Sequence, residues 1–166
     1  DGDPNEILLA ICDKEQDLHI GNIKLGAINW YHRRAEISLL VGNKKYWGKG
    51  IATQAIQLIS EFAFQTLNLN KLMAGAYQNN IGSIKAFQKC GYKIEGEVED
   101  YVLVNNQGVA LIKLGITAKQ FLSHQKEELG FLLWLPAHEM CWLRQHFRCR
   151  IHGRRCRKSV SLSKQL

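Results

Sequence analysis

A short segment of the chain, YWGKGIATQAI, combines two glycines with lysines at the head of a run of helical character. Gly48 and Gly50 lack Cβ atoms, so successive backbone N–H groups can turn into one concavity. The start of a helix adds unpaired N–H groups and a positive dipole end. Lys45 and Lys49 add positive charge. Together these features predict a site for a phosphate or diphosphate group.

The turn is a weak signal when it is taken alone. It has neither the GxxxxGK[ST] spacing of a nucleotide P-loop nor the GxGxxG spacing of a dinucleotide-binding loop. An ordinary connection between a strand and a helix explains it about as well. The elements around the turn must therefore decide between the two interpretations.

The elements before and after the turn predict a mixed α/β domain with one sheet. Apolar runs separated by short polar turns predict an antiparallel meander of three strands, over residues 6–12, 19–28 and 34–41. From Ile51 to Leu67 the apolar residues recur at spacings of three and four, which predicts an amphipathic helix.

The second half of the domain alternates strand and helix again. Residues 71–77 predict a strand, and residues 83–90 predict a short helix that Asn80 caps and Gly91 closes in a left-handed conformation. A hairpin follows, with strand segments expected over residues 92–94, 101–104 and 109–116. The predicted order is β-β-β-α-β-α-β-β.

The two glycine-containing motifs, in this order, resemble the GNAT superfamily of acyl-CoA-dependent N-acetyltransferases. The first motif is KYWGKG at residues 45–50, and the second is NIGS at residues 80–83, heading a helix that closes with Gly91-Tyr92. The family signature is Gln/Arg-x-x-Gly-x-Gly/Ala. Lys45 takes its first position here, which keeps a positive charge but loses the planar fork of arginine. The segment NNIGSIKAFQKCGY resembles most the branch that contains ribosomal-protein N-terminal, spermidine and amino-sugar acetyltransferases.

The resemblance covers residues 6 to about 118 and implies a mostly antiparallel central sheet flanked by helices. GNAT domains usually begin with a strand and two helices, whereas this chain begins near the second strand. We therefore expect residues 1–120 to form a GNAT-like core without those first elements, followed by a basic extension over residues 121–166, helical or irregular. A truncated or frame-shifted reading of a gene would produce both features. The strand edge left by a missing first strand predicts a homodimer.

The resemblance also implies acetyl-CoA as acyl donor and a primary amine as acceptor, joined by direct attack. Backbone N–H groups are expected to bind the coenzyme diphosphate at Trp47, Gly48, Lys49, Gly50, Ile51 and Ala52. The pantetheine arm is expected to pair, like an added strand, with Leu39, Leu40 and Val41, where strand 34–41 splays from strand 71–77. A backbone N–H there would polarise the thioester carbonyl. The remaining expected coenzyme contacts are Asn80, Ser83 and Phe87.

Two catalytic residues are expected from the same resemblance. Glu36 would take the amine proton through water, with a plain solvent-facing carboxylate as the alternative; His32 is a second candidate base, with an ordinary loop histidine as its alternative. Many relatives protonate the leaving thiolate with a tyrosine in the second helix, but this chain has Phe87 there. Ser83 is the expected substitute, with helix capping as its alternative. Cys90 is expected to be a small core residue.

Composition limits the remaining roles. Residues 124–166 hold 9 Lys/Arg against 3 Asp/Glu, while residues 1–123 hold 13 against 12, so the net charge of +7 belongs mainly to the C-terminal extension. Its run RIHGRRCRK lacks the interleaved aromatics of nucleic-acid binders, and a solubilising or incidental extension is the favoured interpretation. Its histidines and cysteines show no CxxC spacing, so no metal is expected at His138, Cys141, His146, Cys149, His152 and Cys156.

The five cysteines of the chain contain no CxxC pair and favour reduced thiols in the cytoplasm over a disulfide framework. The start, DGDPNE, has no signal-peptide pattern, and the apolar runs are too short to span a bilayer, so no membrane contact is expected.

Two functions compete on this sequence. The glycine turn favours an acetyltransferase, whereas Phe87 and the missing first helices favour a non-catalytic GNAT-fold remnant that binds a partner through its basic tail. No acidic run marks a polyamine pocket. The acceptor therefore stays open among a protein N-terminus, an amino sugar, a polyamine and an antibiotic.

Overall fold

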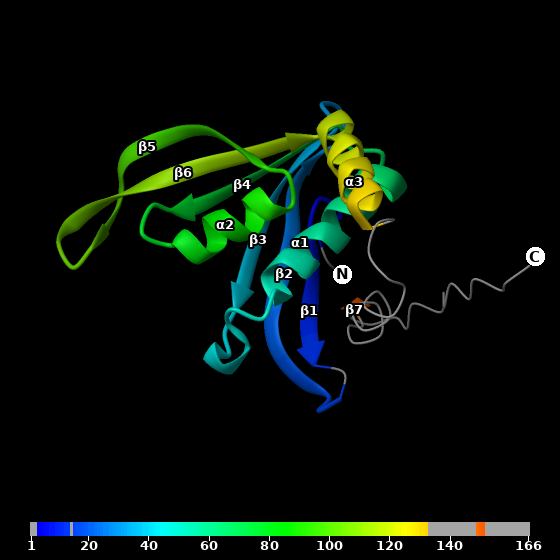
Figure 1. The fold of residues 1–166 in the computed structure, drawn as a ribbon. Helices are drawn as coiled ribbons and strands as arrows, with labels where there is room; N and C mark the ends of the chain where they lie inside the picture. Colours follow the sequence, from blue (N-terminus) through cyan, green and yellow to red (C-terminus); the bar gives the residue numbers. More distant parts are fainter. Residues whose placement is uncertain (1–2, 14, 133–148, 152–166) are drawn as a thin grey trace, which may run out of the picture.

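The computed structural model describes residues 3–13, 15–132 and 149–151, and these build one sheet in the order β5-β6-β4-β3-β2-β1-β7 (Figure 1). Strands β1 (Ile7–Asp13), β2 (Leu18–Asn29) and β3 (Arg34–Val41) form the predicted antiparallel meander. Strand β3 then pairs in parallel with β4 (Lys71–Tyr77), and β4 pairs antiparallel with β6 (Gln107–Thr117). The predicted mixed, mostly antiparallel sheet is confirmed.

The helices lie on one face of this sheet, as Figure 1 shows for α1, α2 and α3. A short 3-10 turn, η1 (Lys44–Tyr46), precedes α1 (Ile51–Glu61), which continues into the π-helical turn η2 (Phe62–Thr66). Helix α2 (Ile81–Lys89) follows β4, and α3 (Ala118–Leu132) follows β6. The predicted Asn80 cap and left-handed Gly91, with a φ of +84°, are both confirmed.

The core lies between these helices and the covered face of the sheet. Along β3 its residues alternate with exposed ones, so that Ala35 and Ile37 are buried while Glu36 and Ser38 are exposed. Cys90 is buried in this core, as predicted. The alternate residues of the inner strands form a second face, which we call the open face.

Strand β5 (Lys93–Val104) differs from the prediction because it is continuous rather than two separate pieces. Two irregularities in its pairing with β6, between Ile94 and Gly96 and between Val98 and Val102, absorb the acidic residues that interrupted the apolar pattern. The resulting β5–β6 hairpin extends away from the rest of the sheet (Figure 1).

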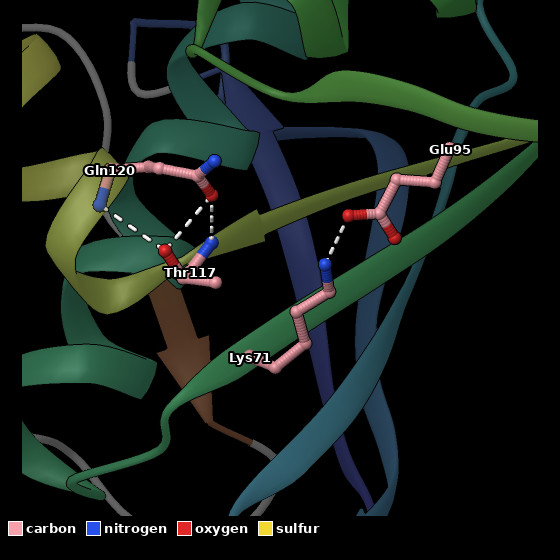
Figure 2. A network of polar contacts seen from close by, with 4 residues as sticks. All are labelled: Lys71, Glu95, Thr117 and Gln120. Carbon is pink, nitrogen blue, oxygen red and sulfur yellow. Dashed lines mark hydrogen bonds and ion pairs between the residues drawn. The ribbon is translucent and has the colours of Figure 1, made fainter.

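Helix α3 crosses the predicted boundary at residue 120. Thr117 and Gln120 form a reciprocal cap at its start: the Thr117 N–H donates to Gln120 Oε1 at 2.8 Å, and the Gln120 N–H donates to Thr117 Oγ1 at 3.3 Å (Figure 2). Phe121 is 1% exposed and its ring lies 5.2 Å from that of Phe64. The core therefore extends beyond residue 120.

The C-terminal segment contributes one further described element. Strand β7 (Cys149–Ile151) pairs antiparallel with β1 over Leu9–Ile11, so it covers part of the edge that was expected to be exposed. The spacing of Met140, Leu143, Phe147 and Ile151 predicts a helix over residues 137–151, but its last three residues form this strand instead. The rest of that predicted helix lies outside the described residues, as do residues 152–158 of the basic run and the residues considered as metal ligands, His138, Cys141, His146, His152 and Cys156.

Two negative findings apply to the described residues alone. None of their helices combines the length and the apolarity needed to cross a bilayer. No three of their His, Cys, Asp or Glu side chains are grouped so that they could hold a metal ion.

Candidate active site

The glycine turn takes the conformation that its sequence predicts. Gly48 has a φ of +74° and Gly50 a φ of +79°, both in the left-handed region where only glycine is unstrained. A Cβ at either position would meet no atom within 4 Å, so the turn is open toward solvent. Gly50 directly precedes the first residue of α1.

The turn leaves a run of N–H groups without acceptors. In the described part of the chain, the amides of residues 48–53 donate to no other group, and the first bond of the helix runs from the Gln54 N–H to the Gly50 carbonyl oxygen at 3.0 Å. The Trp47 N–H differs from the prediction, because it donates to the Lys44 carbonyl oxygen at 3.1 Å. The free run therefore begins at Gly48 and continues one residue past Ala52.

Strands β3 and β4 separate next to this turn. Their parallel pairing joins Arg34–Ile37 to Lys71–Ala74 and then stops, although β3 continues to Val41 and β4 to Tyr77. We call the unpaired ends, residues 38–41 and 75–77, the splay. Leu39 and Leu40 still pair with β2, and Leu40 is 66% exposed. The Val41 carbonyl oxygen already accepts a hydrogen bond from the Trp47 indole at 2.8 Å.

Glu36 sits where the splay begins, on the open face. It lies between Gly26 of β2 and Met73 of β4, and it is exposed. Within the described residues its carboxylate has no hydrogen bond and no ion pair. His32 lies in the turn that precedes β3, at the end of this strand opposite the splay. The structure therefore brings Glu36 to the splay and leaves His32 away from it.

Two further carboxylates share the row that contains Glu36. The row runs Gly26–Glu36–Met73–Gly115 across four strands. A Cβ on Gly26 would touch the side chain of Glu6, and one on Gly115 would overlap the carboxylate of Glu95, so both side chains lie over the glycines. Glu6 pairs with Lys24 at 2.8 Å, and Glu95 pairs with Lys71, as Figure 2 shows. We call Glu6, Glu36 and Glu95 the acidic row.

The residues expected on α2 divide into three environments. The Asn80 side chain accepts from the Ser83 N–H at 3.2 Å and so caps the helix. The Ser83 side chain is half-buried in the first turn of α2. Phe87 points into the core instead of toward a ligand: it is 2% exposed, and its ring lies 5.1 Å from that of Tyr92. Phe87 is therefore left out of the coenzyme contacts that we propose below.

Sequence reasoning missed two residues that touch the turn. The Tyr46 hydroxyl donates to Asp13 Oδ2 at 2.6 Å, and the Lys49 ammonium lies 5.3 Å from the centre of the Tyr46 ring. The bond to Asp13 is the largest cause that raises the pKa of Tyr46 above its ordinary value of 10.0. An Asp that opens a polar turn after a strand was visible in the sequence, but the residue that it reaches, 33 positions away, was not.

The sequence of this chain also matches known proteins. A sequence model described as an acetyltransferase (GNAT) domain matches residues 1–93, which is more than half of the chain. The chain belongs to the GNAT family. The match confirms the resemblance to GNAT acetyltransferases that the two glycine-containing motifs indicate.

Curated members of the GNAT family support the same branch. The chain is 35% identical over 115 residues to a spermidine N(1)-acetyltransferase of Escherichia coli K12, covering 69% of this chain and 60% of that protein. It is 36% identical over 92 residues to an uncharacterised N-acetyltransferase of Bacillus licheniformis, covering 55% of this chain and 51% of that protein. The chain thus spans about three fifths or less of these two GNAT relatives.

Solved GNAT structures share the fold. A spermidine N-acetyltransferase of Vibrio cholerae in complex with CoA and spermine has a TM-score of 0.66 and 25% identity, covering 72% of this chain and 69% of that one. A chimera of the Vibrio cholerae enzyme has a TM-score of 0.67 and 26% identity, covering 73% of this chain and 74% of that one.

Proposed function

We propose that this chain transfers an acetyl group from acetyl-CoA to a primary amine by direct attack. The observation that carries the proposal is the run of free amides at residues 48–53, which lies at the head of α1 beside the splay of β3 and β4. A diphosphate fits such a run because several N–H donors and the positive end of the helix converge on it. Membership of the GNAT family supports the same reaction.

The splay supports the second half of the donor site. An extended pantetheine arm has amide groups that can pair, as an added strand would, with the edge of β3 near Leu39 and Leu40 that β4 does not cover. Asn80 and Ser83 stand at the start of α2, which directly follows the splayed end of β4. In this arrangement a backbone N–H of β3 polarises the thioester carbonyl.

The proposed step needs one base and one acid. The amine nitrogen attacks the thioester carbon, so that a C–N bond forms and the C–S bond breaks. Glu36 takes the proton that the amine loses, through water, and the Ser83 hydroxyl gives a proton to the departing sulfur. Ser83 recovers its proton from solvent, and Glu36 releases its own. A carboxylate near the splay that has no ion pair within the described residues suits the first role.

We propose a cationic polyamine as the acceptor class. The acidic row supports this choice, since three carboxylates lie across the strands from β2 to β6, about 14 Å at the usual strand spacing. A diamine or triamine can therefore contact two of them at once while one nitrogen faces Glu36. The E. coli and Vibrio cholerae relatives are named for spermidine, which points the same way.

The experiment that tests the proposal measures acetyl-CoA binding by calorimetry and acetyl transfer to spermidine by release of free thiol. Glu36→Gln is expected to bind acetyl-CoA as tightly as the wild type and to lose about a hundredfold in kcat, because the base is gone. Glu99→Gln, an exposed carboxylate on the β5–β6 hairpin, is the matched control and is expected to change neither. If the wild type does not bind acetyl-CoA, the proposal is wrong and the remnant interpretation takes its place.

Two finer points belong to the same proposal. We propose the cytoplasm as its compartment, supported by five unevenly spread cysteines that contain no CxxC pair. We also propose a homodimer, formed through a sheet edge; in the described sheet the two edges are β5 and β7. Elution at the monomer mass in gel filtration would contradict the dimer.

A further inference from the structure

Most of the contacts that hold the glycine turn lie ahead of its glycines. The N–H groups of Gly42 and Asn43 donate to the Ile20 carbonyl oxygen at 3.0 and 3.4 Å, and the Asn43 side chain accepts from the Lys45 N–H at 3.1 Å. The Trp47 indole donates to the Val41 carbonyl oxygen. These bonds connect the turn to β2 and β3, but none of them connects it to β1, which lies on the far side of β2 in the sheet.

The carboxylate of Asp13, the last residue of β1, connects the turn to this outer strand. Asp13 Oδ1 accepts from the N–H groups of Glu15 and Gln16 at 2.9 and 3.3 Å, which shapes the turn between β1 and β2. Asp13 Oδ2 accepts from the Tyr46 hydroxyl at 2.6 Å. The same group therefore joins the β1–β2 turn to η1, which directly precedes Trp47 and Gly48.

The Tyr46 ring also reaches past the glycine. The Lys49 ammonium lies 5.3 Å from its centre, so the ring holds a positive charge beside the free amides. The Tyr46 side chain is thus held at its hydroxyl by Asp13 and contacts Lys49 with its ring face. These two contacts restrict the residues on both sides of Gly48. A glycine turn held in this way loses less conformational freedom when it takes up an anion.

We infer that Asp13 and Tyr46 form a clamp that holds the glycine turn in its diphosphate-binding shape, and that they act as positioning residues for the coenzyme. The inference rests on the proposed function and adds two residues to it. The clamp acts on the diphosphate end of the donor, because among the described residues neither Asp13 nor Tyr46 has a hydrogen bond to the splay or to Glu36. Its loss must therefore weaken only donors that carry a diphosphate.

Two acetyl donors test this difference. Acetyl-CoA has the diphosphate, and S-acetylpantetheine has the same thioester without it. Tyr46→Phe keeps the ring and the Lys49 contact but loses the bond to Asp13 and the longer one, of 3.5 Å, to Gln16 Oε1. We expect it to raise the KM for acetyl-CoA about three- to tenfold, the usual effect of one hydrogen bond, with kcat unchanged. The kcat/KM for S-acetylpantetheine is expected to stay within twofold of the wild type.

Matched variants complete the test. Asp13→Asn keeps an oxygen acceptor and should raise the KM for acetyl-CoA less than Asp13→Ala does. Tyr31→Phe removes a phenol that is 89% exposed and should change nothing. Equal losses with both donors, or no loss in Tyr46→Phe, would overturn the clamp. A wild type that does not prefer acetyl-CoA to S-acetylpantetheine would instead show that the proposed diphosphate site is wrong, and the clamp would fall with it.

Discussion

At the scale of single residues, the site depends on main-chain conformation more than on side chains. The run of free amides lies where Gly48 and Gly50 hold positive φ values, next to the first turn of α1. Any other residue type pays a steric penalty in that region, since its Cβ approaches the following carbonyl oxygen.

Gly48→Ala is therefore expected to lose coenzyme affinity even though a Cβ meets no atom there. The penalty of about 1–2 kcal/mol for a left-handed alanine drives the turn toward another shape and redirects the amides. We expect the Kd for acetyl-CoA, measured by calorimetry, to rise about five- to thirtyfold. Gly82→Ala is the control: Gly82 lies in α2 with no atom nearer than 3.9 Å to an added Cβ, and both binding and melting temperature should be retained. Equal binding by wild type and Gly48→Ala would contradict the role of the turn.

At the scale of elements, one buried hydrogen bond joins α1 to the segment that follows α2. Ser60 Oγ lies 2.7 Å from the Tyr92 hydroxyl and donates to the Ile56 carbonyl oxygen, and both side chains are buried. Burial is the main cause that raises the pKa of Tyr92 well above its ordinary value of 10.0.

This raised pKa makes stability depend on pH in the alkaline range. Above about pH 10 the unfolded chain loses the Tyr92 proton while the folded chain keeps it, so the free energy of unfolding falls by about 1.4 kcal/mol per pH unit. Below pH 10 both states hold the proton, and Tyr92 adds no pH dependence. Urea unfolding from pH 8 to 11 should show a shallower decline for Tyr92→Phe than for the wild type. Parallel declines would contradict the assignment.

Helix α3 is a second element whose contribution can be measured. Phe121 is buried against Phe64, while its neighbour Leu122 is 47% exposed. Phe121→Ala is expected to lower the free energy of unfolding by about 3–5 kcal/mol, and Leu122→Ala by less than about 1 kcal/mol. Urea titration of both variants checks this. Similar losses for the two would place the core boundary back at residue 120.

The elements also show what the sequence can and cannot predict. The meander, the helix from Ile51 and the Asn80 cap follow from local patterns, and all are present. The start of α3 carried a local signal too, since Thr117-Ala-Lys-Gln120 is a capping box, but the compositional change after it drew the boundary to residue 120. The continuity of β5 could not be predicted, because bulges that depend on the partner strand decide it.

At the scale of the whole molecule, the sheet order brings together what the sequence keeps apart. Glu6, Glu36 and Glu95 are separated by 30 and 59 positions, so no acidic run marks them. They share one row because β3 and β4 are parallel neighbours and because Gly26 and Gly115 leave room for side chains from adjacent positions. A candidate acceptor surface of this kind follows from topology and cannot be found by reading along the chain.

The acidic row predicts that removal of one of its carboxylates raises the KM for spermidine, whereas removal of a nearby cation lowers it. Glu6→Gln and Glu95→Gln each remove an attraction worth about 0.2–1 kcal/mol at an exposed site, so each should raise this KM by up to about fivefold. Lys24→Gln removes a competing cation and should lower it. A monoamine such as butylamine contacts one carboxylate at most, and its KM should change less than twofold in Glu6→Gln and Glu95→Gln. Because salt screens exposed charges, the differences should shrink at high ionic strength. If Lys24→Gln and Glu6→Gln shift the KM in the same direction, the row does not attract the acceptor by its charge.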